Sequence, residues 1–141
     1  AQVDHSAAYG VQVAEFPTTT EAAKACRDYG IPVMMGAPNV IRGGSHSGNV
    51  AAEPLAKEGL LDILSSDYVP AALLLAAVRL GETWDDLARG LSTVTAAPAR
   101  AVGLTDRGTI ETGKRADLIR FRLHDGTPIL NGVWSRGRRA A

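Results

Sequence analysis

The sequence has little of what marks several specialised classes of protein. It holds one cysteine, Cys26, so no internal disulfide can form, and we predict a buried, inert thiol in a cytoplasmic protein. No apolar run approaches the ~20 residues of a membrane span, and the N-terminus has no signal-peptide pattern. The formal net charge is zero, so charge gives no reason to expect binding to nucleic acid or to an acidic membrane.

The apolar segments that are present follow the order of a parallel α/β protein. We predict short strands at 11–16, 31–35 and 60–64, separated by helices at 22–29 and 50–58. The strands lack clean alternation of apolar and polar residues, which is typical of parallel strands covered on both faces. Three further helices are predicted at 70–80, 83–90 and 92–102, with Thr83 as the cap of the second.

From Leu104 onward the sequence changes to short strand-and-turn segments. We predict β elements at 108–110, 113–117, 118–123 and 128–134. The change predicts a boundary near residue 104, with an α/β part before it and a small β-subdomain after it.

Polar groups follow two of the predicted strands, where parallel α/β folds keep their chemistry. The first group is a glycine-rich loop, predicted to run from Gly36 to Asn49, and the second is the lone acid Asp67. Composition alone leaves the loop open between a phosphate-binding segment, built on converging backbone N–H groups, and a flexible surface loop. Spacing alone favours a turn acid or helix cap before Pro70 for Asp67 over a metal ligand.

The carboxyl-terminal half resembles the signature of the amidohydrolase superfamily. The matching segments are Pro98-Ala-Arg100, Gly103-Leu104, Gly108-Thr-Ile110 and Gly113-Lys-Arg-Ala-Asp-Leu118. The segments Glu15-Phe-Pro-Thr-Thr19, Gly36-Ala-Pro-Asn39, 42–49 and 62–70 are similar to the branch of that superfamily that acts in phosphonate metabolism. The resemblance implies an α/β fold: residues 1–103 are the carboxyl-terminal part of a (β/α)8 TIM-type barrel, with strands six to eight and the final helices. Residues 104–141 are then part of a small flanking β-sandwich subdomain.

The same resemblance implies a metal-dependent diphosphatase of the carbon–phosphorus lyase pathway. It would cleave a ribose 1-methylphosphonate 5-triphosphate to the 5-phosphate and diphosphate, in the cytoplasm. Asp67 would be the metal ligand and the base that activates water, with His46 assisting the leaving group. The implied substrate-binding residues are Arg42, Gly43, Gly44, Ser45, Ser47 and Asn49. Glu15, near the end of its predicted strand, is either a carboxylate at or behind the metal site or a strand-end ion-pair partner.

The resemblance covers only part of a barrel, which leaves alternatives open. A divalent metal, Zn or Mn, would be held mostly by residues absent from this chain, because strands one to five are not seen. The isolated chain is therefore expected to be inactive. Its candidate protein partners are a second copy of itself, in a homo-oligomer, and a complementing N-terminal barrel segment. The alternatives are another amidohydrolase that cleaves a C–N bond, as a deacetylase or cyclic amidase does, and a non-catalytic fragment. A neutral amide would not require the loop from Arg42 to Asn49.

Overall fold

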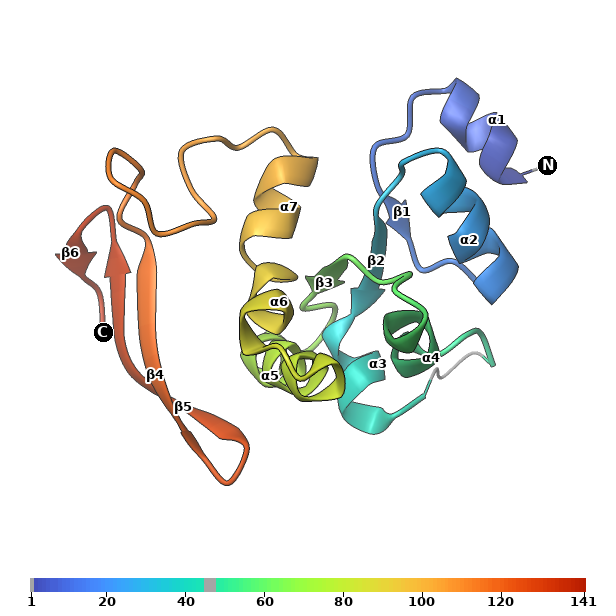
Figure 1. Ribbon diagram of the computed structural model, residues 1–141. Coiled ribbons are helices and arrows are strands. Elements are labelled where there is room, and N and C mark those ends of the chain that lie inside the picture. Colours follow the sequence, from blue (N-terminus) through green and yellow to red (C-terminus); the bar gives the residue numbers. More distant parts are fainter. Residues whose placement is uncertain (1, 45–47) are drawn as a thin grey trace.

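A computed structural model describes residues 2–44 and 48–141 of the chain and places two three-stranded sheets in them (Figure 1). The first sheet is parallel, in the order β1-β2-β3, and consists of β1 (Ala14–Glu15), β2 (Val33–Gly36) and β3 (Ile63–Ser65). The register pairs Glu15 with Met34, and Gly36 with Ser65. The second sheet is antiparallel and consists of β4 (Leu118–His124), β5 (Thr127–Ser135) and β6 (Arg138–Arg139).

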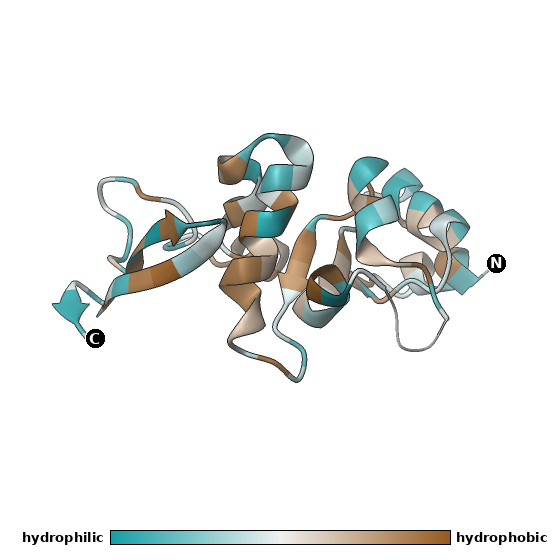
Figure 2. Cartoon of the chain, turned by 90° about the horizontal axis from the view of Figure 1, so that it is seen from below, coloured by the Kyte–Doolittle hydropathy of each residue, from teal (hydrophilic) through white to brown (hydrophobic). Residues whose placement is uncertain are grey.

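The helices divide into two groups along the chain. Those near the first sheet are α1 (Gln2–Ala8), α2 (Thr20–Asp28), α3 (Ala37–Arg42) and α4 (Ala52–Lys57). The later group is α5 (Ala72–Trp84), α6 (Leu87–Ser92) and α7 (Ala96–Ala101). This later group lies between the two sheets, so that the second sheet and α1 are at opposite ends of the molecule (Figure 1). Hydrophobic segments gather in the middle of the molecule (Figure 2).

The core forms where α2, α4 and α5 pack with the first sheet. Its largest fully buried side chains include Val33 and Met35 of β2, Leu55 of α4 and Leu80 of α5. Cys26 of α2 belongs to the same cluster, which confirms the prediction of a buried thiol. Burial raises the pKa of this thiol and so disfavours the reactive thiolate.

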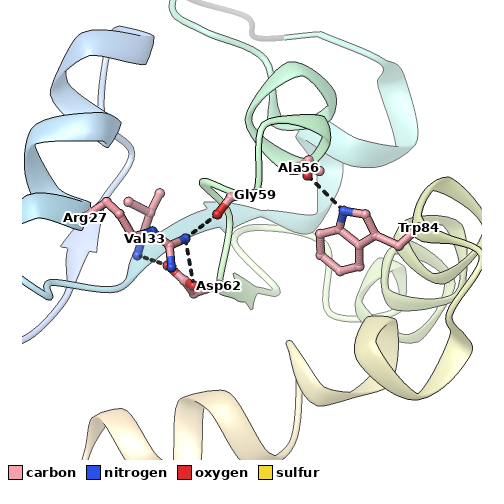
Figure 3. A network of polar contacts seen from close by, with 6 residues as sticks. All are labelled: Arg27, Val33, Ala56, Gly59, Asp62 and Trp84. Carbon is pink, nitrogen blue, oxygen red and sulfur yellow. Dashed lines mark hydrogen bonds and ion pairs between the residues drawn. The ribbon is translucent and has the colours of Figure 1, made fainter.

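Polar contacts tie α2 to the beginning of two strands (Figure 3). The Asp62 carboxylate accepts a hydrogen bond from the Val33 backbone N–H at 2.9 Å and pairs with the Arg27 guanidinium at 3.2 Å. Arg27 also donates to the carbonyl of Gly59. Elsewhere in the core, the indole N–H of Trp84 donates to the Ala56 carbonyl at 2.8 Å, which joins α5 to α4. These contacts help to hold β2 beside β3 in the register that places their ends together.

Replacing Asp62 by alanine is expected to lower the free energy of unfolding by about 2 kcal/mol, because it leaves the part-buried Val33 N–H and the Arg27 guanidinium without this carboxylate. Urea denaturation measures the change. Glu53→Ala is the control, since its ion pair with Lys57 is exposed and should contribute less than about 0.5 kcal/mol. Equal losses in the two variants would contradict the prediction.

The predicted helix start at Thr83 is wrong. Thr83 lies inside α5, where its hydroxyl donates to the Arg79 carbonyl at 3.0 Å. The left-handed backbone of Asp85, at φ 51, ends α5, and Asp86 caps α6 by accepting from the Arg89 N–H at 2.9 Å. Both threonine and aspartate are good capping residues, and the packing of α5 against α6 selects the second.

The structure also corrects two predicted strands and the predicted glycine-rich loop. The segments 108–110 and 113–117 form no strand and consist of bends, a turn and irregular backbone. The Asp117 carboxylate accepts a hydrogen bond from the Arg136 N–H at 2.9 Å, which lowers the pKa of Asp117 and supports a structural role for it. The segment 36–49 is not a continuous loop, because its first part forms α3, with Pro38 in the first turn where a missing N–H costs nothing. Helix α1 was not predicted. The division into domains at 1–103 and 104–141 stays a prediction.

Candidate functional site

The carboxyl ends of the three parallel strands meet at one edge of the first sheet. A pocket of about 320 Å³ lies at this edge. The residues that line it include Phe16 after β1, Met35 of β2, Asn39 of α3, Asn49, and Asp67 and Tyr68 after β3. The lining residues therefore come from β2, from α3 and from the segments that follow β1 and β3.

Two of the lining residues have left-handed backbones. Phe16 has φ 53 and Asp67 has φ 51. Aspartate tolerates this conformation, whereas a bulky aromatic residue adopts it at a cost of about 1–3 kcal/mol. The Phe16 N–H donates to the Met34 carbonyl at 3.0 Å, and this bond continues the pairing of β1 with β2. Backbone strain of this kind concentrates at functional sites, which supports the assignment of this edge as the candidate site.

Gly36 is the last residue of β2, and its lack of a side chain leaves room for the Asp67 carboxylate and the Phe16 ring. A Cβ atom on Gly36 would lie 2.9 Å from Oδ2 of Asp67 and 3.2 Å from the Phe16 ring. The carboxylate thus sits directly over the end of β2. The sequence analysis included Gly36 only as the first residue of the glycine-rich loop and did not identify Phe16 or Tyr68 as site residues. The only available signal for these two was their position at the end of a predicted strand or shortly after one.

Replacing Gly36 by alanine is expected to push the Asp67 carboxylate aside. The backbone angles, φ -77 and ψ 137, suit any residue, so the effect comes from the added methyl group alone. Ordinary contact begins near 3.4 Å, and 3.4 − 2.9 gives a minimum shift of about 0.5 Å. A crystal structure of the variant measures this displacement. Gly44→Ala is the control, because nothing lies within 4 Å of its Cβ position; an unmoved Asp67 carboxylate in Gly36→Ala would contradict the prediction.

The structure brings some of the predicted site residues together. Gly44, Asn49 and Asp67 line the same pocket. Arg42 is the last residue of α3, and its guanidinium lies 5.8 Å from the ring centroid of Tyr68, which also lines the pocket. Their roles in binding and catalysis stay predictions.

The other predicted site residues are placed differently. Gly43 ends α3 in a left-handed conformation at φ 73, where glycine is favoured. Glu15 is exposed on β1 and does not line the pocket. Ser45, His46 and Ser47 lie outside the described residues.

The described residues do not by themselves form a metal centre. Within 2–44 and 48–141 there is no group of three or more histidine, cysteine, aspartate or glutamate side chains arranged to hold a metal ion. Asp67 contributes a carboxylate to the pocket, but a divalent metal needs several ligands. The helices of the described segments include none long and apolar enough to cross a membrane.

Comparison with known proteins extends these observations. The model of the amidohydrolase family matches residues 7–140. The chain is 52% identical over 142 residues to the alpha-D-ribose 1-methylphosphonate 5-triphosphate diphosphatase of Escherichia coli (strain K12), in an alignment covering 99% of this chain and 38% of that protein. The crystal structure of an amidohydrolase from Thermotoga maritima MSB8 is similar with a TM-score of 0.58 and 16% identity, over 92% of this chain and 43% of that one. The chain thus spans about two fifths of the curated relative, 38%.

Proposed function

Because the chain belongs to the amidohydrolase family, we propose that it supplies the carboxyl-terminal part of a diphosphatase of phosphonate metabolism. The resemblance to this family in the sequence motifs is confirmed by the family match. The observation that carries the proposal is the 52% identity to the Escherichia coli diphosphatase along nearly the whole chain. A location in the cytoplasm is part of the proposal.

The fold is mixed α/β and is shared with a solved amidohydrolase. We assign β1, β2 and β3 to strands six, seven and eight of a (β/α)8 barrel, and the second sheet to part of a flanking β-sandwich. Sequential parallel strands, with helices in the connections, support the barrel assignment. A pocket at the carboxyl ends of these strands is where barrel enzymes bind substrate.

The substrate in this proposal is a ribose 1-methylphosphonate 5-triphosphate. Water attacks the polyphosphate, the bond between the first and second phosphates breaks, and diphosphate leaves while the 5-phosphate remains on the sugar. Asp67 accepts the proton of the attacking water, because its carboxylate lines the pocket. Arg42 stabilises the charge on the phosphoryl oxygens, and His46 donates a proton to the leaving diphosphate.

Amidohydrolases generally use divalent metals, and this chain offers an incomplete set of ligands. The pocket contributes the carboxylate of Asp67, and the described residues contain no further group that would complete a site. We propose that the remaining ligands of a Zn or Mn ion lie in polypeptide outside this chain. Activity then requires a complementing N-terminal barrel segment.

Complementation tests the proposed function. The chain is assayed alone and together with the part of the Escherichia coli relative that precedes the matched region, with ribose 1-methylphosphonate 5-triphosphate as substrate and ³¹P NMR as the detector of diphosphate. We expect diphosphate release from the mixture and none from the chain alone. An N-acyl substrate run in parallel tests the amide-cleaving alternative. Turnover of the amide alone would replace the proposed reaction, and no turnover of either substrate would favour a non-catalytic fragment.

A further inference from the structure

Asn39 lines the candidate pocket and also holds a neighbouring helix in place. It lies on α3, and its Oδ1 accepts a hydrogen bond from the backbone N–H of Ala52 at 2.8 Å. Ala52 is the first residue of α4, and the N-cap residue of that helix, Ala51, makes no side-chain capping bond. The first N–H groups of a helix have no acceptor within that helix. Asn39, on α3, supplies an acceptor for one of these groups of α4.

This bond determines the orientation of the Asn39 amide. A backbone N–H can only donate, so the group that faces Ala52 must be the oxygen and not the amino group. Its oxygen is engaged, and within residues 2–44 and 48–141 the Ala52 bond is the hydrogen bond described for this side chain. We take the Nδ2 amino group, a donor of two hydrogens, as the part of Asn39 that serves a ligand. The pocket wall at Asn39 is thus suited to an acceptor, such as a phosphoryl oxygen.

The helix that carries Asn39 also carries a positively charged side chain. Arg42 follows Asn39 by three residues on α3, a spacing that puts both side chains on the same side of a helix. Its guanidinium lies 5.8 Å from the ring centroid of Tyr68, another lining residue. The negative charge at the pocket is the Asp67 carboxylate, above the end of β2. Of these two charged side chains, the one that attracts an anion, Arg42, is on α3.

We propose that Nδ2 of Asn39 donates a hydrogen bond to a phosphoryl oxygen of the polyphosphate group bound in this pocket. The inference rests on the proposed function, because the ligand is the polyphosphate part of that substrate. Asn39 then has two effects: its oxygen orders the beginning of α4, and its amino group binds the anion. Both depend on a single amide orientation.

Asn39→Asp separates the two effects. The aspartate keeps an oxygen for the Ala52 N–H, with the added strength of a charged acceptor, but loses both hydrogens and adds a negative charge to the pocket. Asn131→Asp, on the exposed surface of β5, is the matched control with the same change in chemistry and charge. The full 141-residue chain is titrated with inorganic tripolyphosphate in metal-free buffer, by calorimetry. We expect Kd to rise about tenfold or more in Asn39→Asp, with no fall in the melting temperature, and to stay constant in Asn131→Asp.

A second measurement reports on the donor itself. The side-chain ¹⁵N–¹H₂ signal of Asn39, identified by its loss in Asn39→Asp, is expected to shift when tripolyphosphate is added to the unchanged chain. If that signal stays in place and Asn39→Asp binds tripolyphosphate as the unchanged chain does, the inference is overturned while the proposed function stands. Absence of tripolyphosphate binding to the unchanged chain would also overturn it, whereas the proposed function is judged separately, by diphosphate release.

Discussion

Replacing Gly90 by alanine is expected to lower the free energy of unfolding by about 3 kcal/mol or more. Gly90 lies on α6, and a Cβ atom there would come within 2.3 Å of the Ala77 carbonyl oxygen and 2.6 Å of the Gly81 nitrogen on α5. Both are backbone atoms, so no side chain can rotate away and the two helices must separate. Overpacking of a core usually costs about 1–3 kcal/mol, and a rigid backbone contact lies at the upper end of that range or beyond it.

Urea denaturation followed by circular dichroism measures this effect. Gly44→Ala is the matched control, since the same substitution there meets open space and should change stability by less than about 1 kcal/mol. A chain that no longer folds agrees with the expectation for Gly90→Ala. A midpoint equal to that of the unchanged chain would show that α5 and α6 do not approach as closely as described.

Replacing Asp67 by asparagine is expected to reduce kcat of the complemented enzyme by about 10²- to 10⁴-fold, the usual contribution of a positioned acid or base. Asparagine matches aspartate in size and also tolerates the left-handed backbone at φ 51, so the fold should be kept. The amide cannot accept the proton of the attacking water. Diphosphate release under substrate saturation measures kcat, and a thermal melt checks the fold.

Asp125→Asn is the control for this substitution. Asp125 is exposed in the turn between β4 and β5 and has a similar left-handed backbone, φ 47, so it shares the conformation of Asp67 but not the pocket. We expect this variant to keep the full rate. If Asp67→Asn also kept kcat within about tenfold of the unchanged enzyme, the proton acceptor would have to be another group.

Local signals predicted much of the secondary structure. Helix α2 was expected at 22–29 and runs from Thr20 to Asp28, because Thr19 caps it through the Ala22 N–H and Gly30 follows its end in a left-handed conformation. The three parallel strands were expected from short apolar runs and lie within one to three residues of the predicted ends. The beginning of α6 was misplaced because two capping residues were locally equivalent, and the contact of Gly90 with α5 is not encoded by neighbours in sequence.

The sequence by itself determined the family, the order of the strands, and the positions of Asp67 and the glycine-rich segment after two of them. Motifs and apolar runs are local, so they can be recognised without knowing which segments meet. Only the tertiary structure decided that Gly36 lies beneath the Asp67 carboxylate and that Asn39 caps α4. These contacts join residues 13 or more positions apart, and they depend on the parallel register of β2 with β3 and on the packing of α3 beside α4, which no local pattern specifies.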